Sequence, residues 1–265
     1  MIFFSAFQDS YLWLPLIGLT IGFLATLTGG GGGFFFPPVL ILVFGIPAPV
    51  AVATSLAATL PICAVGSVGH YRQGNVDVPS GMVFVIAGIT GALIGAGFTR
   101  LIDPDQLKSI FGIYLVVLAM IMIISIRRGE SDNGLQSAPY GRYGWHRISR
   151  GSFFGFIGGT ITGTFGTSGA TPVQAGLFTL KIPVKKVVGT SLVVVLVNTF
   201  FALTGHFLVG RIDLTLLLFL TSGTLIGAFA GPILFSGLKI QRMEGSIRKY
   251  YAYMVFSLGL ILVIT

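Results

Sequence analysis

Long apolar runs, separated by short connections rich in glycine, proline or charged residues, make up almost the whole chain. In the first half they cover about residues 11–28, 34–45, 50–70, 79–100 and 106–126, and in the second half about 147–164, 170–180, 186–207, 214–235 and 246–264. A helix that spans a bilayer needs about 20 residues. Eight runs approach or exceed this length, whereas the second run of each half is too short. The pattern therefore predicts an all-α integral membrane protein with about eight full transmembrane helices plus two short or re-entrant helices.

The two halves are copies of one another. A shift of 136 positions, without a gap, aligns the glycine-rich stretch 28–33 with 164–169, Thr54-Ser55-Leu56 with 190–192, and Asp77 with Asp213. Between residues 21 and 77, 17 of the 57 aligned positions are identical. An internal duplication in so apolar a chain favours a transporter built from two structural repeats. We expect a first repeat at 1–126, a polar linker at 127–146 and a second repeat at 147–265.

Composition supports the membrane assignment. Hydrophobic residues make up 54% of the chain, charged residues 9%, and the mean hydropathy is +0.92, whereas soluble domains carry about a quarter charged residues. The net charge of +8 resides in short connections, so it indicates membrane orientation rather than nucleic-acid binding. The single cysteine, Cys63, excludes disulfides within the chain and a cysteine metal cluster. No cofactor is expected, and the first apolar run, with no basic residue before it, does not resemble a cleaved signal peptide.

The positive residues are distributed unevenly between the two ends of the predicted helices. One end collects 13 of the 16 Lys and Arg residues, including Arg72, the linker arginines, Lys181, Lys185 and Lys186. The positive-inside rule makes this end cytoplasmic and places both termini outside. Each repeat then crosses the membrane an odd number of times, so the two repeats are expected to have inverted topologies.

Glycine-rich turns precede the two short runs. The five glycines of 29–33 stand between a full-length and a half-length apolar run, and irregular backbone at this depth is tolerated only where protein or a watery cavity covers it. The short helix that follows directs its free N–H groups and the positive end of its dipole toward the turn, which favours anions. In the second repeat, Thr164, Thr167 and Ser168 add hydroxyl groups. We expect the two turns to meet near the midplane and to bind substrate there.

Close helix packing is the alternative explanation for glycines in membrane helices. It suits Gly91/Gly95 and Gly227/Gly231, which are spaced four apart inside full-length runs. It explains less of a run of five glycines before a short segment. Because no Gly-Lys-Ser/Thr follows, the glycine run is not a phosphate-binding P-loop.

Matched polar residues give further candidates. Thr54-Ser55 and Thr190-Ser191 lie about two turns into their helices, where they either bond to their own helix carbonyls or form a second wall of the site. The candidate substrate-binding residues are Thr28, Gly30, Gly31, Gly32, Gly33, Thr54, Ser55, Thr164, Gly166, Thr167, Ser168, Gly169, Thr190 and Ser191. Asn198 and Gln174 lack counterparts, and interhelical hydrogen bonding explains each as well as ligand contact does.

His70 and His206 also match, and each ends a helix. Two alternatives are open: polar anchors at the membrane interface, or groups with a gating or proton-transfer role. No carboxylate or thiol accompanies either histidine, so a metal site is not expected.

All eight Asp and Glu residues lie in connections or at the ends of apolar runs. Cation paths and proton-driven pumps commonly use carboxylates within the membrane, so their positions favour an anion as cargo. An anion that leaves a cell with a negative interior gains about 2.3 kcal/mol per charge per 100 mV. The chain also has no Ser/His/Asp or zinc-type spacing, so no enzyme activity is expected.

At these motifs the chain resembles the TauE/SafE family of sulfite and organosulfonate exporters. The resemblance rests on TGGGGGFFFPPVL (28–40), IPAPVAVATSL (46–56), GTITGTFGTSGA (159–170) and IPVKKVVGTSL (182–192). It covers the chain end to end, although the second turn reads GTSGA rather than a full glycine run.

This resemblance implies an inner-membrane carrier that exports a small sulfur oxyanion such as sulfite, sulfoacetate or a related organosulfonate. Alternating access is the expected mechanism, with an anion channel or a carrier for another small anion as alternatives. The expected partners are the anionic substrate and the lipid bilayer, with a possible homodimer and no nucleic acid.

Overall fold

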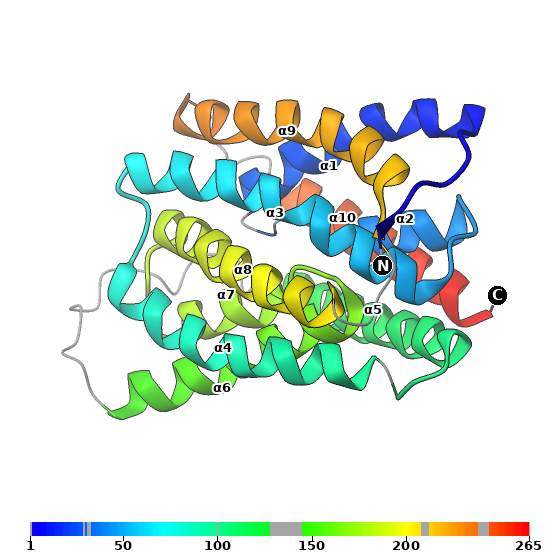
Figure 1. The fold of residues 1–265 in the computed structure, drawn as a ribbon. Coiled ribbons are helices and arrows are strands. Elements are labelled where there is room, and N and C mark those ends of the chain that lie inside the picture. The colour runs from blue at the N-terminus through cyan, green and yellow to red at the C-terminus, as the bar shows by residue number, and fades with distance from the viewer. Residues whose placement is uncertain are drawn as a thin grey trace.

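The computed structural model describes residues 2–28, 30, 33–99, 101–127, 145–207, 212–237 and 244–264. Within these ranges the chain is mostly helical (Figure 1). The ten α-helices are α1 (Leu14–Thr28), α2 (Phe36–Leu42), α3 (Ala48–Arg72), α4 (Val78–Phe98), α5 (Pro104–Arg127), α6 (Trp145–Phe165), α7 (Ala170–Thr179), α8 (Val184–Phe207), α9 (Leu214–Gly237) and α10 (Glu244–Ile264). A short 3₁₀ helix, η1 (Asp9–Trp13), precedes α1, and strand β1 (Ile2–Phe3) pairs in parallel with β2 (Ile212–Asp213).

The order of the helices repeats with the shift found in the sequence. Adding 136 to the first residue of α3 or of α4 gives the first residue of α8 or of α9, and α1, α2 and α5 shifted in the same way overlap α6, α7 and α10. The duplicated sequence is therefore a duplicated set of five helices.

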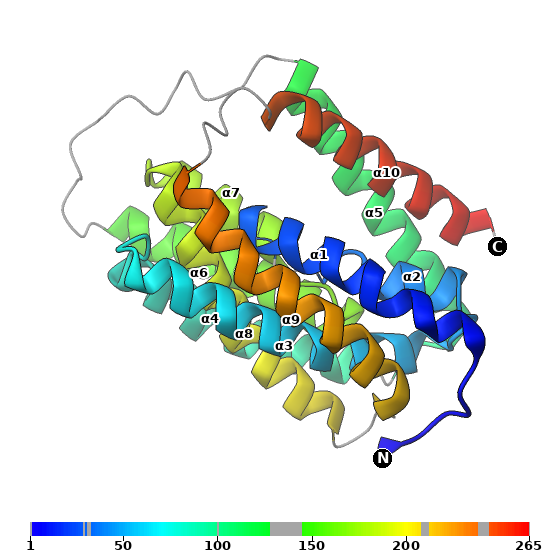
Figure 2. The same cartoon turned by 90° about the horizontal axis from the view of Figure 1, so that it is seen from above.

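The second helix of each set is short, as predicted. α2 has 7 residues and α7 has 10, and soon after each helix a residue with positive φ turns the chain: Gly45 at +62° and Lys181 at +58°. In Figures 1 and 2, α2 lies toward the right, the end at which both termini lie, whereas α7 lies toward the left. The two short helices thus occupy opposite ends of the molecule.

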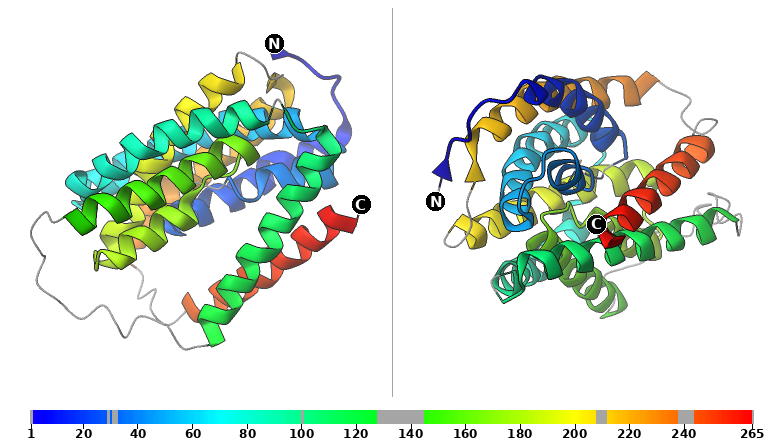
Figure 3. Two further views of the ribbon diagram at one scale, coloured as in Figure 1. Left: turned by 90° about the horizontal axis from the view of Figure 1, so that it is seen from below. Right: turned by 90° about the vertical axis from the view of Figure 1, so that its right-hand side faces the viewer.

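The closest helix packing joins one repeat to the other. α4 packs along α6 and α1 packs along α9 (Figures 2 and 3). Small residues permit this approach: a methyl group on Gly91 or Gly95 would overlap backbone atoms of α6, and one on Gly227 would overlap backbone atoms of α1. Packing through small residues is typical of helices in membranes, and it accounts for these glycines as the sequence suggested.

Because helices of one repeat pack against helices of the other, the protein contains two mixed bundles. The first bundle consists of α1, α3 and α9, and the second of α4, α6 and α8; α3 and α8 pack against each other between them. In Figure 1 the helices of the first bundle run from right to left and those of the second from left to right. Because each bundle contains helices from both repeats, the ranges 1–126 and 147–265 are repeats of sequence rather than separate packing units.

α5 and α10 form a separate pair to one side of the bundles (Figure 3). They approach through Gly112 and Gly259, whose added methyl groups would each lie 2.9 Å from the carbonyl oxygen of the other. α5 also contacts α3, and α10 contacts α2.

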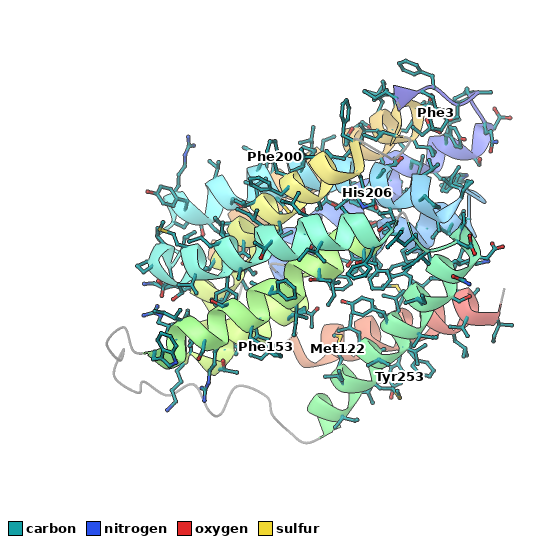
Figure 4. All side chains as sticks on the ribbon, turned by 60° about the horizontal axis from the view of Figure 1, so that its bottom comes forward. Phe3, Met122, Phe153, Phe200, His206 and Tyr253 are labelled. Carbon is teal, nitrogen blue, oxygen red and sulfur yellow. The ribbon has the colours of Figure 1, made fainter. Side chains whose placement is uncertain are left out.

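Five segments of the described chain are long and apolar enough to cross a membrane: 9–26, 48–72, 78–98, 104–124 and 184–207. Large apolar side chains cover the outer faces of the helices; Phe153 and Phe200, for example, project outward from α6 and α8 (Figure 4) and are 61% and 56% exposed. Such a surface suits lipid rather than water. The fold is that of a multi-pass membrane protein.

Candidate functional site

The second glycine-rich turn connects α6 to α7. The amide of Gly166 donates to the carbonyl oxygen of Thr162 at 3.0 Å and ends α6, and Gly169 is the N-cap of α7. Their φ angles of +66° and +53° lie in the left-handed region, which glycine enters without the steric cost that a Cβ atom imposes.

This turn is wedged between α3 and α6. A methyl group on Gly166 would lie 2.6 Å from the carbonyl oxygen of Val52, and one on Gly169 would overlap the Gly158 carbonyl and the Thr162 hydroxyl. Both positions therefore require glycine, because the backbone is left-handed and no room exists for a Cβ atom.

The first turn is described in part. The amide of Gly30 donates to Ala25 O at 3.0 Å, and residues 33–35 form a turn before α2. Thr28 is the last residue of α1, and its side chain lies outside the described part. Gly31 and Gly32 also lie outside the described residues.

The two turns meet, as the sequence predicted. A methyl group on Gly33 would lie 2.5 Å from the backbone nitrogen of Ser168 and 3.0 Å from the carbonyl carbon of Thr167. The starts of α2 and α7, one from each repeat, are therefore brought together inside the protein.

Two hydroxyl groups at this meeting point have no hydrogen-bond partner among the residues that the structure describes. The side chains of Thr167 and Ser168 are both 0% exposed, and neither hydroxyl makes a hydrogen bond with any described residue. The third hydroxyl of the turn, that of Thr164, donates to Gly95 O at 3.4 Å. A buried hydroxyl without a partner costs about 1–3 kcal/mol, so Thr167 and Ser168 offer two unsatisfied groups beside the N-terminus of a ten-residue helix.

Aromatic rings cover this turn from α5. Phe165, the residue before Gly166, stacks on Phe111 and Tyr114 with ring centroids 5.4 and 5.2 Å apart. No local pattern predicts this stack, because its rings come from different repeats. The aromatic pair three residues apart in α5 is the one local feature of the sequence that points to it.

Ser55 and Ser191 lie beside the second turn and α7. The hydroxyl of Ser55 donates to Val52 O at 2.9 Å and to Gly166 O at 3.2 Å, which joins α3 to the turn. The Gln174 amide donates to the Ser191 hydroxyl at 3.4 Å. Both serines thus reach the second turn or the helix that follows it.

Thr54 and Thr190 accept hydrogen bonds from backbone amides of the opposite repeat. The backbone amide of Asp213 donates to the Thr54 hydroxyl at 3.2 Å, and the amide of Asp77 donates to the Thr190 hydroxyl at 2.8 Å. Since Thr190 and Asp213 are the counterparts of Thr54 and Asp77, the two bonds are reciprocal, as contacts across a two-fold axis are. These hydroxyls fix the starts of α4 and α9 against α8 and α3.

Replacing Thr190 with valine is expected to destabilise the protein by about 1–3 kcal/mol, because the buried amide of Asp77 loses its acceptor. Thr190→Ser should restore most of the loss, and Thr54→Val should act similarly through Asp213. Denaturation of the purified protein in mixed micelles measures the effect. A fully stable Thr190→Val protein that fails to transport would instead assign this hydroxyl to the substrate.

His70 and His206 are buried, at 0% and 3% exposure, rather than placed at an exposed interface. The Nε2 atom of His70 lies 3.3 Å from Thr26 O, and that of His206 lies 2.6 Å from Gly163 O. Because a carbonyl only accepts, Nε2 carries the proton in each contact. Each histidine therefore holds the last turn of the helix that leads into the glycine-rich turn of its own repeat.

The two aspartates at the starts of α4 and α9 are buried and differ in their partners. The Asp77 carboxylate accepts from the Arg147 guanidinium at 3.2 Å and from Ser80 N at 3.3 Å, and Arg147 also contacts the Ser80 hydroxyl. Asp213 accepts instead from backbone amides, including that of Ser5 at 3.3 Å. The sequence pattern identifies Arg147 only as an orientation signal, because its partner Asp77 lies 70 residues away.

No group of three or more His, Cys, Asp or Glu side chains that could hold a metal ion occurs in the part of the chain that the structure describes. Cys63 is a free, buried thiol in α3.

A duplicated set of apolar helices, whose two glycine-rich turns meet inside the protein, defines a multi-pass membrane protein of the transporter class. Residues 14–262 match the family described as sulfite exporter TauE/SafE, and the chain belongs to this family.

Relatives support the same class. The chain is 29% identical over 217 residues to the "probable membrane transporter protein YdhB" of Bacillus subtilis (strain 168), a match that covers 82% of this chain and 85% of that protein. It is 25% identical to the "probable membrane transporter protein YunE" of the same organism, over 69% of this chain and 70% of that protein. A "probable membrane transporter protein" of Xylella fastidiosa (strain Temecula1 / ATCC 700964) is 27% identical, over 66% of each chain. No solved structure matches the chain. These names indicate a membrane transporter, not an enzyme.

Proposed function

We propose that this protein exports a small sulfur oxyanion, such as sulfite, sulfoacetate or a related organosulfonate, across the inner membrane by alternating access. The observation that carries the proposal is the pair of buried, unpartnered hydroxyls of Thr167 and Ser168 where the two turns meet. They lie beside the positive N-terminal end of α7, which attracts anions. The family description supplies the sulfur oxyanion as the substrate class.

The mechanism rests on inverted repeats, with eight membrane-spanning helices and with α2 and α7 entering from opposite sides. The reciprocal bonds of Thr54 with Asp213 and of Thr190 with Asp77 support a two-fold relation. The opposite ends at which α2 and α7 lie support the inversion (Figure 1). Inverted repeats that meet at a central site open to each side in turn when the bundles rock.

The orientation that we propose places both termini outside and the 127–146 linker in the cytoplasm. Arg72, Arg147, Lys181, Lys185 and Lys186 belong to segments at the left of Figure 1, where α3 ends, α6 begins and α7 connects to α8. Positive residues of this kind favour the cytoplasmic side. Export of an anion toward the outside then proceeds along the membrane potential.

The double variant Thr167→Val with Ser168→Ala tests the site. It is expected to lower the uptake of labelled sulfite into proteoliposomes to near the level of empty liposomes. The unfolding midpoint should stay the same or rise, because the replaced hydroxyls make no hydrogen bond with any described residue.

The control for this test is Thr204→Val with Ser222→Ala, which makes the same chemical change at exposed hydroxyls bonded to their own helices. This control should transport normally. Retained transport in the Thr167/Ser168 variant would remove the turn from the site. Counterflow separates the proposed carrier from an anion channel: in a carrier, unlabelled anion on the opposite side accelerates the transport of labelled anion, whereas a channel gives a conductance that does not saturate at low concentration.

A further inference from the structure

The duplication provides an internal control for every buried polar side chain. Polar residues that occur at matched positions in both repeats have hydrogen-bond partners that hold the fold, as described above for Thr54 and Thr190 and for the two histidines. Thr26 and Thr162 follow the same rule, since their hydroxyls donate to Gly22 O and Gly158 O.

Four buried polar residues of the second repeat, and Ser67 of the first, have no polar counterpart and make no side-chain hydrogen bond with the residues that the structure describes. The counterparts of Thr167, Ser168, Asn198 and Thr199 are Gly31, Gly32, Ile62 and Cys63. All four side chains are 0% exposed, and their polar atoms make no hydrogen bond with the residues that the structure describes. The first two form the turn of the proposed site, and the other two lie on α8.

Asn198 lies at the junction of the three helices of the second bundle. A methyl group on Gly88 of α4 would lie 2.6 Å from its Nδ2 atom and 2.8 Å from its Cγ atom, and a methyl group on Gly159 of α6 would overlap the carbonyl of Gly88. The residue before Gly159 contacts Gly169, the N-cap of α7. Asn198 is therefore connected to the second turn through two neighbours: it packs on Gly88 of α4, and the stretch of α6 on which Gly88 packs also contacts the turn.

The fold does not require a polar group at this position. Burying an amide and a hydroxyl without partners destabilises a protein, and the first repeat has the aliphatic Ile62 at the equivalent position. A polar side chain that weakens the fold at a central position is typical of a functional site.

We infer that Asn198 and Thr199 form a second polar subsite, which binds an uncharged group of the substrate that both donates and accepts hydrogen bonds, such as a hydroxyl. This inference rests on the proposed function. An amide presents donors and an acceptor side by side, whereas a deprotonated oxyanion only accepts and would leave Oδ1 facing negative charge. The substrate is then a small anion with a hydroxyl on a short carbon chain: its anionic group binds at Thr167 and Ser168 and its hydroxyl at Asn198 and Thr199.

The test compares 2-hydroxyethanesulfonate with ethanesulfonate, which lacks only the hydroxyl, as substrates in proteoliposomes. The unmodified protein should prefer the hydroxylated probe in apparent affinity by about tenfold or more, because its loss leaves buried groups unpaired. Asn198→Leu keeps the branching of the side chain and Thr199→Val keeps its shape; each should reduce this ratio toward one. Thr204→Val, on the exposed face of the same helix, should leave the ratio unchanged.

The unfolding midpoint of Asn198→Leu should stay the same or rise. A lowered midpoint with equal losses for both probes would overturn the inference and make Asn198 a structural contact between helices. If Asn198→Leu transports normally and the affinity ratio of the two probes is unchanged, the inference is also overturned. The amide would then bind only a water molecule. If the unmodified protein transports neither sulfonate nor sulfite, the proposed function itself fails, which is a different result from either of these.

Discussion

Replacing Arg147 with methionine is expected to destabilise the protein by about 3–5 kcal/mol, because it removes the guanidinium that pairs with the buried Asp77 carboxylate. Asp77 is 3% exposed by side chain and Arg147 13%, and the guanidinium lies 3.2 Å from the carboxylate. The pair joins the start of α4 to the start of α6, so its loss should also loosen the closest packing between the repeats. Denaturant titration of the purified protein measures the change.

A double-mutant cycle separates the ion pair from the packing of the long arginine side chain. Asp77→Asn with Arg147→Met should recover much of the stability that Arg147→Met loses, since no uncompensated charge remains. Lys185→Met removes an exposed charge near the same end and should change stability by less than about 0.5 kcal/mol. Equal losses in the single Arg147 variant and in the double variant would show that packing alone matters.

The positions of the helices could be predicted from the sequence because they depend on local patterns. A run of about 20 apolar residues, a proline at its start and a glycine after its end each act within a few residues of chain. The short helices α2 and α7 were predictable for the same reason. The 136-residue shift also predicted that α2 and α7 occupy equivalent positions in the two repeats. The meeting of the two turns was predicted from the duplication, because transporters built from two repeats commonly bring equivalent segments together at a central site.

The exchange of helices between the repeats was not predictable in this way. The apolar faces of α4 and α9 are compatible with several neighbours, and only the fit of Gly91 and Gly95 against α6, or of Gly227 against α1, selects the partner from the other repeat. The Asp77–Arg147 pair depends on that same exchange. A sequence pattern contains little information about contacts between segments 70 residues apart.

The matched Thr-Ser pairs show a second limit of sequence analysis. Their presence in both repeats made all four residues candidates for the substrate site, yet Thr54 and Thr190 accept backbone hydrogen bonds that each bundle needs. Both copies of a duplicated fold share the same structural requirements. Polar residues that match in both repeats are therefore expected to make the hydrogen bonds that hold the fold together. Substrate recognition does not require matched residues. We propose that the substrate is bound mainly by residues of the second repeat that have no polar counterpart in the first.

Replacing Gly169 with alanine is expected to destabilise the protein by about 3 kcal/mol or more, with loss of transport. A left-handed alanine costs about 1–2 kcal/mol, and overpacking adds about 1–3 kcal/mol because the new methyl group would overlap the Gly158 carbonyl. Gly166→Ala should act similarly. Gly97→Ala is the matched control: Gly97 lies in α4, and apart from its own helix backbone and chain neighbours no atom lies within 4 Å of the added methyl group, so helix propensity predicts unchanged or slightly higher stability.

The contrast with the hydroxyl variants makes this glycine prediction specific. Gly169→Ala should lower both the unfolding midpoint and transport, since it displaces the start of α7, whereas Thr167→Val with Ser168→Ala should lower transport alone. A stable, active Gly169→Ala protein would show that the turn adopts another conformation in the membrane. Loss of stability in both variants would make the turn a structural element, and the anion site would then lie elsewhere.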